Sequence, residues 1–129
     1  MPEPVIICLH QPALELAEKV ASLCDGEVHG LQSRVNTIPE TFEKTKEHLQ
    51  DLFQKGHPLV GICSSGILIR SLADVLSDKH TEPPVLAVAE DGSCVIPLLG
   101  GHHGANDLAR KIASGLGAVA AVTTAGDLK

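Results

Sequence analysis

Two adjacent histidines, His102 and His103, lie in the glycine-rich segment Gly100-Gly101-His102-His103-Gly104-Ala105-Asn106, which precedes a helical pattern. A helix amino terminus favours a neutral imidazole, which could accept a proton or bind a metal ion. Asn106, one turn further on, could orient a substrate oxygen. The alternative is that one imidazole caps the helix and the other is solvated, and spacing alone favours this simpler arrangement.

A second segment, Ser64-Ser65-Gly66, has the same chemical character. Both segments place small residues and free backbone N–H groups at the start of a helix, where anions bind. Neither ends in the Lys-Ser/Thr pair of a phosphate-binding loop, and the chain has no GxGxxG dinucleotide motif. The expected ligand is an anion held by backbone amides, either a carboxylate or a phosphate. Because ligands of open α/β sheets bind beyond the carboxyl ends of strands, we expect both segments to line one crevice.

Three further side chains could reach this crevice. Arg70, one turn past the Ser-Ser-Gly segment, could hold a carboxylate through two hydrogen bonds or form an ion pair with Asp74. Glu90 could act as a general acid or base, whereas a solvated turn is the simpler interpretation for Asp91. His10 directly follows the first apolar run and is a weaker candidate.

Apolar runs alternate with helical patterns along the chain and predict the elements that position these residues. Strands are expected near residues 5–9, 27–31, 59–63, 85–89, 93–96 and 118–123, and helices near 12–24, 40–55, 66–77 and from the glycine-rich segment to Gly117. The Asp91-Gly92 pair predicts a hairpin in which both residues can adopt positive φ. The predicted fold is α/β: a mostly parallel open sheet of about five or six strands, with helices on both faces and one antiparallel β-hairpin.

The composition excludes several classes of protein. A chain of 129 residues, 43% hydrophobic and 20% charged, suits a single α/β domain over residues 1–129. Two Phe, no Tyr, no Trp and a net charge of −6 argue against nucleic-acid binding by base stacking or by a positive surface. No membrane-spanning run or signal sequence is evident, so a cytoplasmic protein is expected. The four dispersed cysteines fit neither a disulfide framework nor a zinc site, and Cys8 and Cys24 are expected to be buried thiols.

Several segments together resemble the CbiG family of cobalamin biosynthesis. Gly61-Ile62-Cys63-Ser64-Ser65-Gly66-Ile67 followed by Arg70 is similar to that family's G-I-x-[A/S]-S-G-I-x-x-R segment. Residues 88–99 resemble its E-D-G-x-x-V-I-x-L-L segment, residues 101–106 resemble G-H-x-G-G-A-N, and Thr123-Thr124-Ala125 follows. The resemblance covers residues 58–127 in order, whereas residues 1–57 agree only in their general α/β layout.

The resemblance implies a cobalt-precorrin-5A hydrolase, which opens a δ-lactone on the corrin ring and releases acetaldehyde. By analogy His102 would be the general base, Glu90 a second acid or base, and Asn106 an oxyanion or carboxylate ligand. The implied substrate-binding residues are Ser64, Ser65, Gly66, Arg70, Gly100, Gly101, His103 and Gly104. The chain would need no cofactor and no metal of its own, because cobalt arrives with the substrate.

The implied partners are an anionic corrinoid intermediate and other enzymes of cobalamin synthesis, among them a precorrin methyltransferase. A non-catalytic alternative is a corrinoid-binding domain fused to, or partnering, a precorrin-3B methyltransferase. On either interpretation the chain is expected to be a fragment of a longer natural protein, and a homodimer is one option for its assembly. A flavodoxin-like phosphate-binding domain is a third alternative, which the absence of Tyr and Trp for flavin stacking disfavours.

Overall fold

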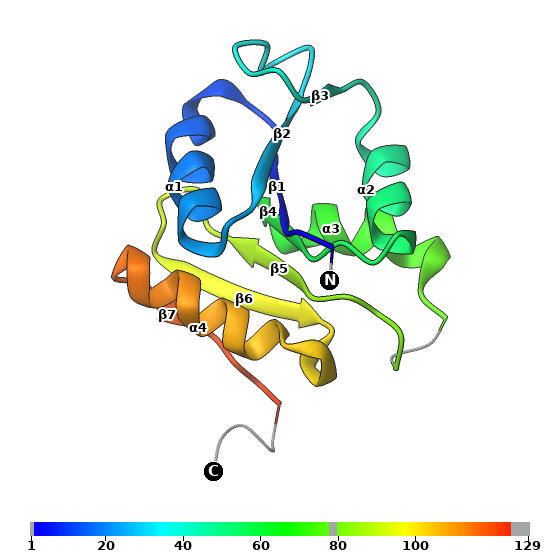
Figure 1. The fold of residues 1–129 in the computed structure, drawn as a ribbon, viewed down its shortest axis with the longest axis vertical. Helices are drawn as coiled ribbons and strands as arrows, with labels where there is room; N and C mark the ends of the chain where they lie inside the picture. The colour runs from blue at the N-terminus through cyan, green and yellow to red at the C-terminus, as the bar shows by residue number, and fades with distance from the viewer. Residues whose placement is uncertain (1, 78–79, 125–129) are drawn as a thin grey trace.

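The computed structural model describes residues 2–77 and 80–124, in which seven strands form one sheet in the order β3-β2-β1-β4-β5-β6-β7 (Figure 1). The strands are β1 (Val5–Cys8), β2 (Glu27–Leu31), β3 (Thr41–Phe42), β4 (Leu59–Ile62), β5 (Val85–Val88), β6 (Cys94–Leu99) and β7 (Val119–Ala120). Strands β1 to β5 are mutually parallel, whereas β6 pairs antiparallel with β5 and parallel with β7. The predicted α/β class, with a mostly parallel open sheet and one antiparallel pair, is confirmed.

Helices cover both faces of this sheet. They are α1 (Leu14–Cys24), α2 (Thr45–Gln54), α3 (Ser65–Leu72) and α4 (Ala105–Leu116), with single 3-10 turns at η1 (Gln11–Ala13), η2 (Ala73–Val75) and η3 (Gly101–His103). Because side chains alternate along a strand, Ile6 and Cys8 of β1 pack under α1 and α4, whereas Val5 and Ile7 pack under α2 and α3. Burial on both faces explains why β1, β4 and β5 read as continuous apolar runs.

The segment after β2 differs from the prediction of a helix over residues 40–55. The Gly30 N–H donates to the Glu40 carbonyl at 3.0 Å, and the Gln32 N–H donates to the Phe42 carbonyl at 2.8 Å. These bonds hold residues 41–42 as an edge strand, so α2 begins only at Thr45. The predicted helix over 66–77 also ends earlier, because α3 is followed by the 3-10 turn η2.

The β5–β6 hairpin forms as predicted, but with a different turn. Gly92 has φ = 72°, and no positive φ occurs at Asp91. Instead the Gly92 N–H donates to the Ala89 carbonyl at 2.8 Å, and the Ser93 N–H donates to Asp91 Oδ1 at 2.9 Å. Asp91 is therefore occupied in stabilising the turn. Hydrogen bonding from the side chain and then the backbone N–H of Ser93 holds the pKa of the Asp91 carboxyl below the usual value.

The chain changes direction across the sheet between β1 and β4. From β1 it proceeds to β2 and β3 on one side, then crosses to β4 and β5 on the other (Figure 1). In open α/β sheets this reversal leaves a crevice at the carboxyl ends of the two central strands. In residues 2–77 and 80–124 no helix has both the length and the apolar character of a transmembrane segment. The expected loop at the chain end, including Ala125 of the family motif, lies outside the described residues from position 125 onward.

Candidate active site

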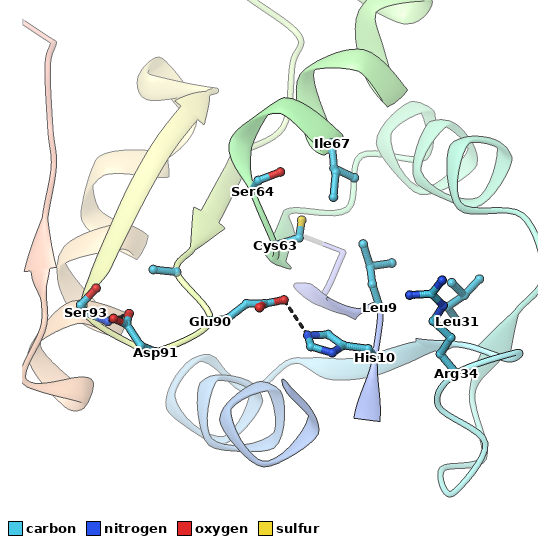
Figure 2. Close-up of a pocket in the computed structure, with 11 residues that line it drawn as sticks. Leu9, His10, Leu31, Arg34, Cys63, Ser64, Ile67, Glu90, Asp91 and Ser93 are labelled. Carbon is cyan, nitrogen blue, oxygen red and sulfur yellow. Dashed lines mark hydrogen bonds and ion pairs between the residues drawn. The ribbon is translucent and has the colours of Figure 1, made fainter. Parts of the chain in front are cut away.

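An open cleft of about 800 Å³ lies at the carboxyl ends of β1, β4 and β5, where the strand order reverses (Figure 2). We call it the switch-point cleft. It is lined by Leu9, His10, Leu31, Arg34, Cys63, Ser64, Ile67, Ala89, Glu90, Asp91 and Ser93. Loops after four parallel strands, β1, β2, β4 and β5, thus supply its titratable groups, as the doubly wound architecture predicts.

His10 and Glu90 form a hydrogen-bonded pair in this cleft. The His10 Nε2 atom lies 2.6 Å from Glu90 Oε1, and their side chains are 36% and 54% exposed (Figure 2). An ionised carboxylate only accepts hydrogen bonds, so in the neutral imidazole the Nε2 atom carries the proton and Nδ1 is the basic atom. The pair can therefore take a proton from water and stabilise the imidazolium that results.

The backbone around His10 is fixed from both sides. The residue is extended, with φ = −157° and ψ = 155°, and caps η1, where the Ala13 N–H donates to its carbonyl at 3.1 Å. The Cys8 thiol donates to the same carbonyl at 3.3 Å. Glu90 lies in the short turn that follows β5, so the hairpin sets its position. The two side chains meet because β1 and β5 both flank β4 and run parallel to it.

The amino terminus of α3 opens onto the same cleft. Ser64 is the N-cap residue, is exposed, and makes no hydrogen bond from its side chain to the helix. Its hydroxyl and the N–H groups of the first turn, at Ser65 and Gly66, are therefore available to an anion. This placement matches the expectation for the Ser-Ser-Gly segment.

Arg70 folds back over that helix start. A Cβ added at Gly66 would lie 3.0 Å from Arg70 Nη1, so the glycine leaves the space that the guanidinium occupies. Asp74, the alternative partner expected from the sequence, pairs with Lys46 at 2.8 Å instead. Within the described part of the chain, Arg70 has no ion-pair partner, which leaves its guanidinium available to a ligand carboxylate.

Arg34 is a cleft residue that the sequence did not single out. It lies on the other side of His10 from Glu90 in Figure 2, in a tight turn where the Arg34 N–H donates to the Leu31 carbonyl at 2.9 Å. No described carboxylate pairs with its side chain. Leu9, Leu31 and Ile67 form an apolar surface beside it. The cleft therefore combines an apolar surface with a cation and a helix amino terminus, an arrangement suited to a large ligand with acidic substituents.

The cleft cysteine is not a nucleophile. Burial, with the negative charge of Glu90 in addition, raises the pKa of the Cys63 thiol from 9.0 to about 11. Burial also raises the thiol pKa of Cys8 and of Cys24, and all three side chains are buried, as expected for Cys8 and Cys24. Because the thiolate is the reactive form, these residues are inert at neutral pH.

The glycine-rich segment lies beyond the amino ends of the parallel strands, at the edge of the sheet opposite the switch-point cleft. The expectation that both segments line one crevice is therefore wrong. Strand β6 is antiparallel to β5, with Val85 opposite Leu99 and Val88 opposite Val95. Gly100 therefore lies against Pro83 and Pro84 just before β5, whereas Glu90 follows the end of β5. Four strand residues at roughly 3.3 Å each separate the two edges by about 10 Å or more, before the flanking turns are added.

The segment itself has the geometry that its glycines suggest. Gly100 and Gly104 have φ values of 77° and 96° and enclose η3, in which His102 and His103 are exposed. The ring of His80 lies 6.4 Å from that of His102. Asn106, in contrast, is only 3% exposed. The structure thus divides the predicted site residues into two groups. At the carboxyl ends of the parallel strands lie Ser64, Ser65, Gly66, Arg70 and Glu90, and at their amino ends lie Gly100, Gly101, His102, His103, Gly104 and Asn106. The roles expected for these residues stay predictions.

The importance of two cleft residues, His10 and Arg34, could not be predicted from the sequence. His10 carried one signal, its place directly after the first buried strand, but nothing local connected it with Glu90. Arg34 carried no signal, because nothing in the neighbouring sequence shows that its turn opens onto the cleft.

Comparisons with known proteins place the chain among cobalamin biosynthesis proteins. The model of a family described as "Cobalamin synthesis G N-terminal" matches residues 47–127. Two relatives described as cobalt-precorrin-5A hydrolase are 40% identical over 82 residues (Priestia megaterium) and 45% identical over 71 residues (Salmonella typhimurium). These alignments cover 63% and 54% of this chain but 22% and 20% of the relatives, so the chain spans about a fifth of their length.

A solved structure from Sulfolobus solfataricus, described as a cobalamin biosynthesis protein G homolog, has the same fold. Its TM-score is 0.68, and the match covers 94% of this chain and 36% of that chain at 22% identity. The fold similarity therefore extends over the amino-terminal strands, which the family model does not match.

Proposed function

Because the chain belongs to the cobalamin synthesis G N-terminal family, we propose that it acts in corrin-ring synthesis by hydrolysing the δ-lactone of cobalt-precorrin-5A, with release of acetaldehyde. The name shared by the two relatives supports this reaction. Cobalt enters as part of the substrate. The switch-point cleft is the proposed site.

The observation that carries the proposal is the pair formed by His10 and Glu90 at 2.6 Å. Lactone hydrolysis needs a base for the attacking water and a proton for the leaving oxygen. In the proposed reaction His10 Nδ1 takes a proton from water, whose oxygen bonds to the acyl carbon. The acyl–oxygen bond then breaks, and the imidazolium returns the proton to the ring oxygen, which becomes a hydroxyl. Acetaldehyde is released when this hydroxyl gives up its proton and the carbon–carbon bond between its carbon and the macrocycle breaks. The electron pair of that bond and a proton go to the macrocycle. Glu90 holds the imidazole and stabilises its charged form.

Substrate binding is proposed to use the apolar surface and the cations of the cleft. A corrinoid is a large ring that carries several carboxylates at its rim. The ring would lie against Leu9, Leu31 and Ile67, and carboxylates would reach Arg34 and the amino terminus of α3 with its nearby Arg70. These positive groups matter because the chain as a whole carries a net charge of −6.

His102, the base implied by the family resemblance, lies at the other edge of the sheet and cannot share a site with Glu90 in this chain. The two candidate bases therefore make different predictions for the same assay. If His102 is the base, the reaction occurs at the glycine-rich segment, and Glu90 has no part in it.

The direct test is to incubate the purified chain with cobalt-precorrin-5A and to measure acetaldehyde. His10→Gln and Glu90→Gln are compared with Glu18→Gln, an exposed acidic position on α1 outside the cleft. We expect the first two variants to lose turnover by roughly 100-fold or more, and the third to retain it. Tight binding of the corrinoid without acetaldehyde release by the unmodified chain would overturn the proposal and support the non-catalytic corrinoid-binding alternative.

A further inference from the structure

Four titratable side chains gather on the side of the sheet covered by α2, and none of them lines the switch-point cleft. They are Glu27 and His29 of β2, Glu40 just before β3, and His48 of α2. We propose that Glu27, His29 and Glu40 bind a divalent transition-metal ion, and that His48 positions the His29 ring for this purpose. We call these four residues the β2-edge cluster. The inference does not rest on the proposed hydrolase function.

The backbone brings the three proposed ligands together. Glu27 and His29 are two residues apart on one strand, so their side chains leave the same face. The Gly30 N–H donates to the Glu40 carbonyl at 3.0 Å, which fixes Glu40 beside His29, directly before the neighbouring strand β3. One ligand atom from each of the three side chains lies within 4.8 Å of the other two. A single ion could therefore contact all three after small rotamer changes.

The His29 ring is already held in an orientation that suits a metal ligand. Its Nε2 atom lies 3.1 Å from Glu27 Oε1, and its Nδ1 atom lies 2.8 Å from His48 Nε2. The His29 side chain is only 14% exposed. The Glu27 carboxylate only accepts hydrogen bonds, so without an ion the His29 Nε2 atom carries the proton. Metal binding at Nε2 requires the other tautomer, in which Nδ1 carries the proton and donates to His48 Nε2, the outer hydrogen bond that histidine ligands generally make.

His48 is itself held in place. Its ring stacks on Phe42 with the centroids 4.5 Å apart and the planes 10° apart. The Phe42 side chain is buried against the face that α2 covers. The buried Phe42 therefore holds the His48 ring, and His48 holds the His29 ring through their hydrogen bond.

The charges of the cluster favour a cation. Two carboxylates approach one imidazole, and within residues 2–77 and 80–124 no Lys or Arg forms an ion pair with Glu27 or Glu40. One imidazole nitrogen and carboxylate oxygens suit Zn²⁺, Mn²⁺ or Fe²⁺. Three protein ligands also leave at least one position for water, because such ions take four or more ligands. The three proposed ligands precede the segment matched by the family model, whereas the positioning residue His48 lies just inside it.

Isothermal titration calorimetry with Zn²⁺ on the EDTA-treated chain tests the site. Glu27→Gln, His29→Gln and Glu40→Gln are compared with Glu43→Gln, which removes an exposed carboxylate close by but outside the cluster. We expect one site whose affinity falls at least about tenfold in each of the first three variants and changes less than about twofold in the fourth. Circular dichroism of each variant confirms that the fold is retained.

The shift in melting temperature caused by Zn²⁺ is a second measurement, which remains informative if a substitution destabilises the fold. Zn²⁺ should raise the melting temperature of the unmodified chain and of Glu43→Gln, but not that of Glu40→Gln, whose side chain is exposed and whose removal leaves the core intact. Absence of Zn²⁺ binding, or equal affinity in Glu40→Gln and Glu43→Gln, would overturn the proposal. The second outcome would assign the ion to other histidines, such as His102 and His103.

Discussion

The Nε2 atom of His10 lies 2.6 Å from Oε1 of Glu90, although 80 positions separate the two residues in the sequence. The pair exists because β1 and β5 flank β4 in parallel, so the loops that follow them open at the same edge. The pair lies where the strand order reverses, and α3 begins at the same place. A hydrogen-bonded His–Glu pair, a helix amino terminus and an apolar surface are thereby brought into one cleft.

Arg34 in the cleft and Arg70 beside the start of α3 should control substrate affinity. Arg34→Gln and Arg70→Gln are each expected to raise the KM for cobalt-precorrin-5A by about three- to tenfold with little change in kcat, because they bind carboxylates away from the reacting bond. Steady-state acetaldehyde release measures both constants. Arg110→Gln, whose guanidinium lies 3.8 Å from Asp107 on α4, is the matched control. A fall in kcat at unchanged KM would contradict the proposed binding roles.

The buried Cys63 thiol should make stability depend on alkaline pH. Its pKa is raised from 9.0 to about 11 by burial, so the folded state keeps the proton that the unfolded state loses first. The stabilisation is fully present below the unfolded pKa of 9.0 and is lost as pH rises through the folded value of about 11. Two pK units correspond to about 3 kcal/mol, which is the upper limit of the loss.

Urea unfolding at about pH 8 and about pH 10.5 measures this dependence. Cys63→Ala is the comparison, since it removes the titrating group while the raised thiol pKa of Cys8 and of Cys24 still contributes in the same direction. We expect the variant to lose less stability than the unmodified chain over this range. Equal losses in the two proteins would show that Cys63 keeps an ordinary pKa.

Two glycines of the glycine-rich segment should respond differently to alanine. Both have positive φ, 77° at Gly100 and 96° at Gly104, so each substitution costs about 1 kcal/mol of backbone strain. At Gly100 the added Cβ would also lie 2.6 Å from the Pro83 carbonyl oxygen, whereas at Gly104 nothing lies within 4 Å. We therefore expect Gly100→Ala to lower the free energy of unfolding by about 3 kcal/mol or more, and Gly104→Ala by about 1 kcal/mol. If urea unfolding gave equal losses of unfolding free energy for the two variants, the close approach of Gly100 to Pro83 would be contradicted.

The buried centre of the fold could be predicted from the sequence. Strands β1, β4 and β5 read as continuous apolar runs because helices cover both of their faces, and α4 shows the spacing of a one-sided helix. Strand β3 could not be predicted. Its two residues are held by hydrogen bonds to β2, a long-range pairing that no local pattern records.

The candidate site shows the same limit. The Ser-Ser-Gly segment and Glu90 were identified from their types and positions, but His10 gained importance only when the sheet placed it beside Glu90. The position of His102 followed from a signal already in the sequence. The Asp91-Gly92 hairpin reverses the chain, so β6 must end at the edge opposite to Glu90. The direction of one strand thus decides which candidate residues can act together.

Acetaldehyde release from cobalt-precorrin-5A by His10→Gln, measured beside His102→Gln, tests the central claim most directly. If the switch-point cleft is the active site, His10→Gln loses roughly 100-fold or more of the kcat of the unmodified chain, and this loss exceeds that of His102→Gln. Full turnover in His10→Gln together with a large loss in His102→Gln would contradict the account and place the chemistry at the glycine-rich segment.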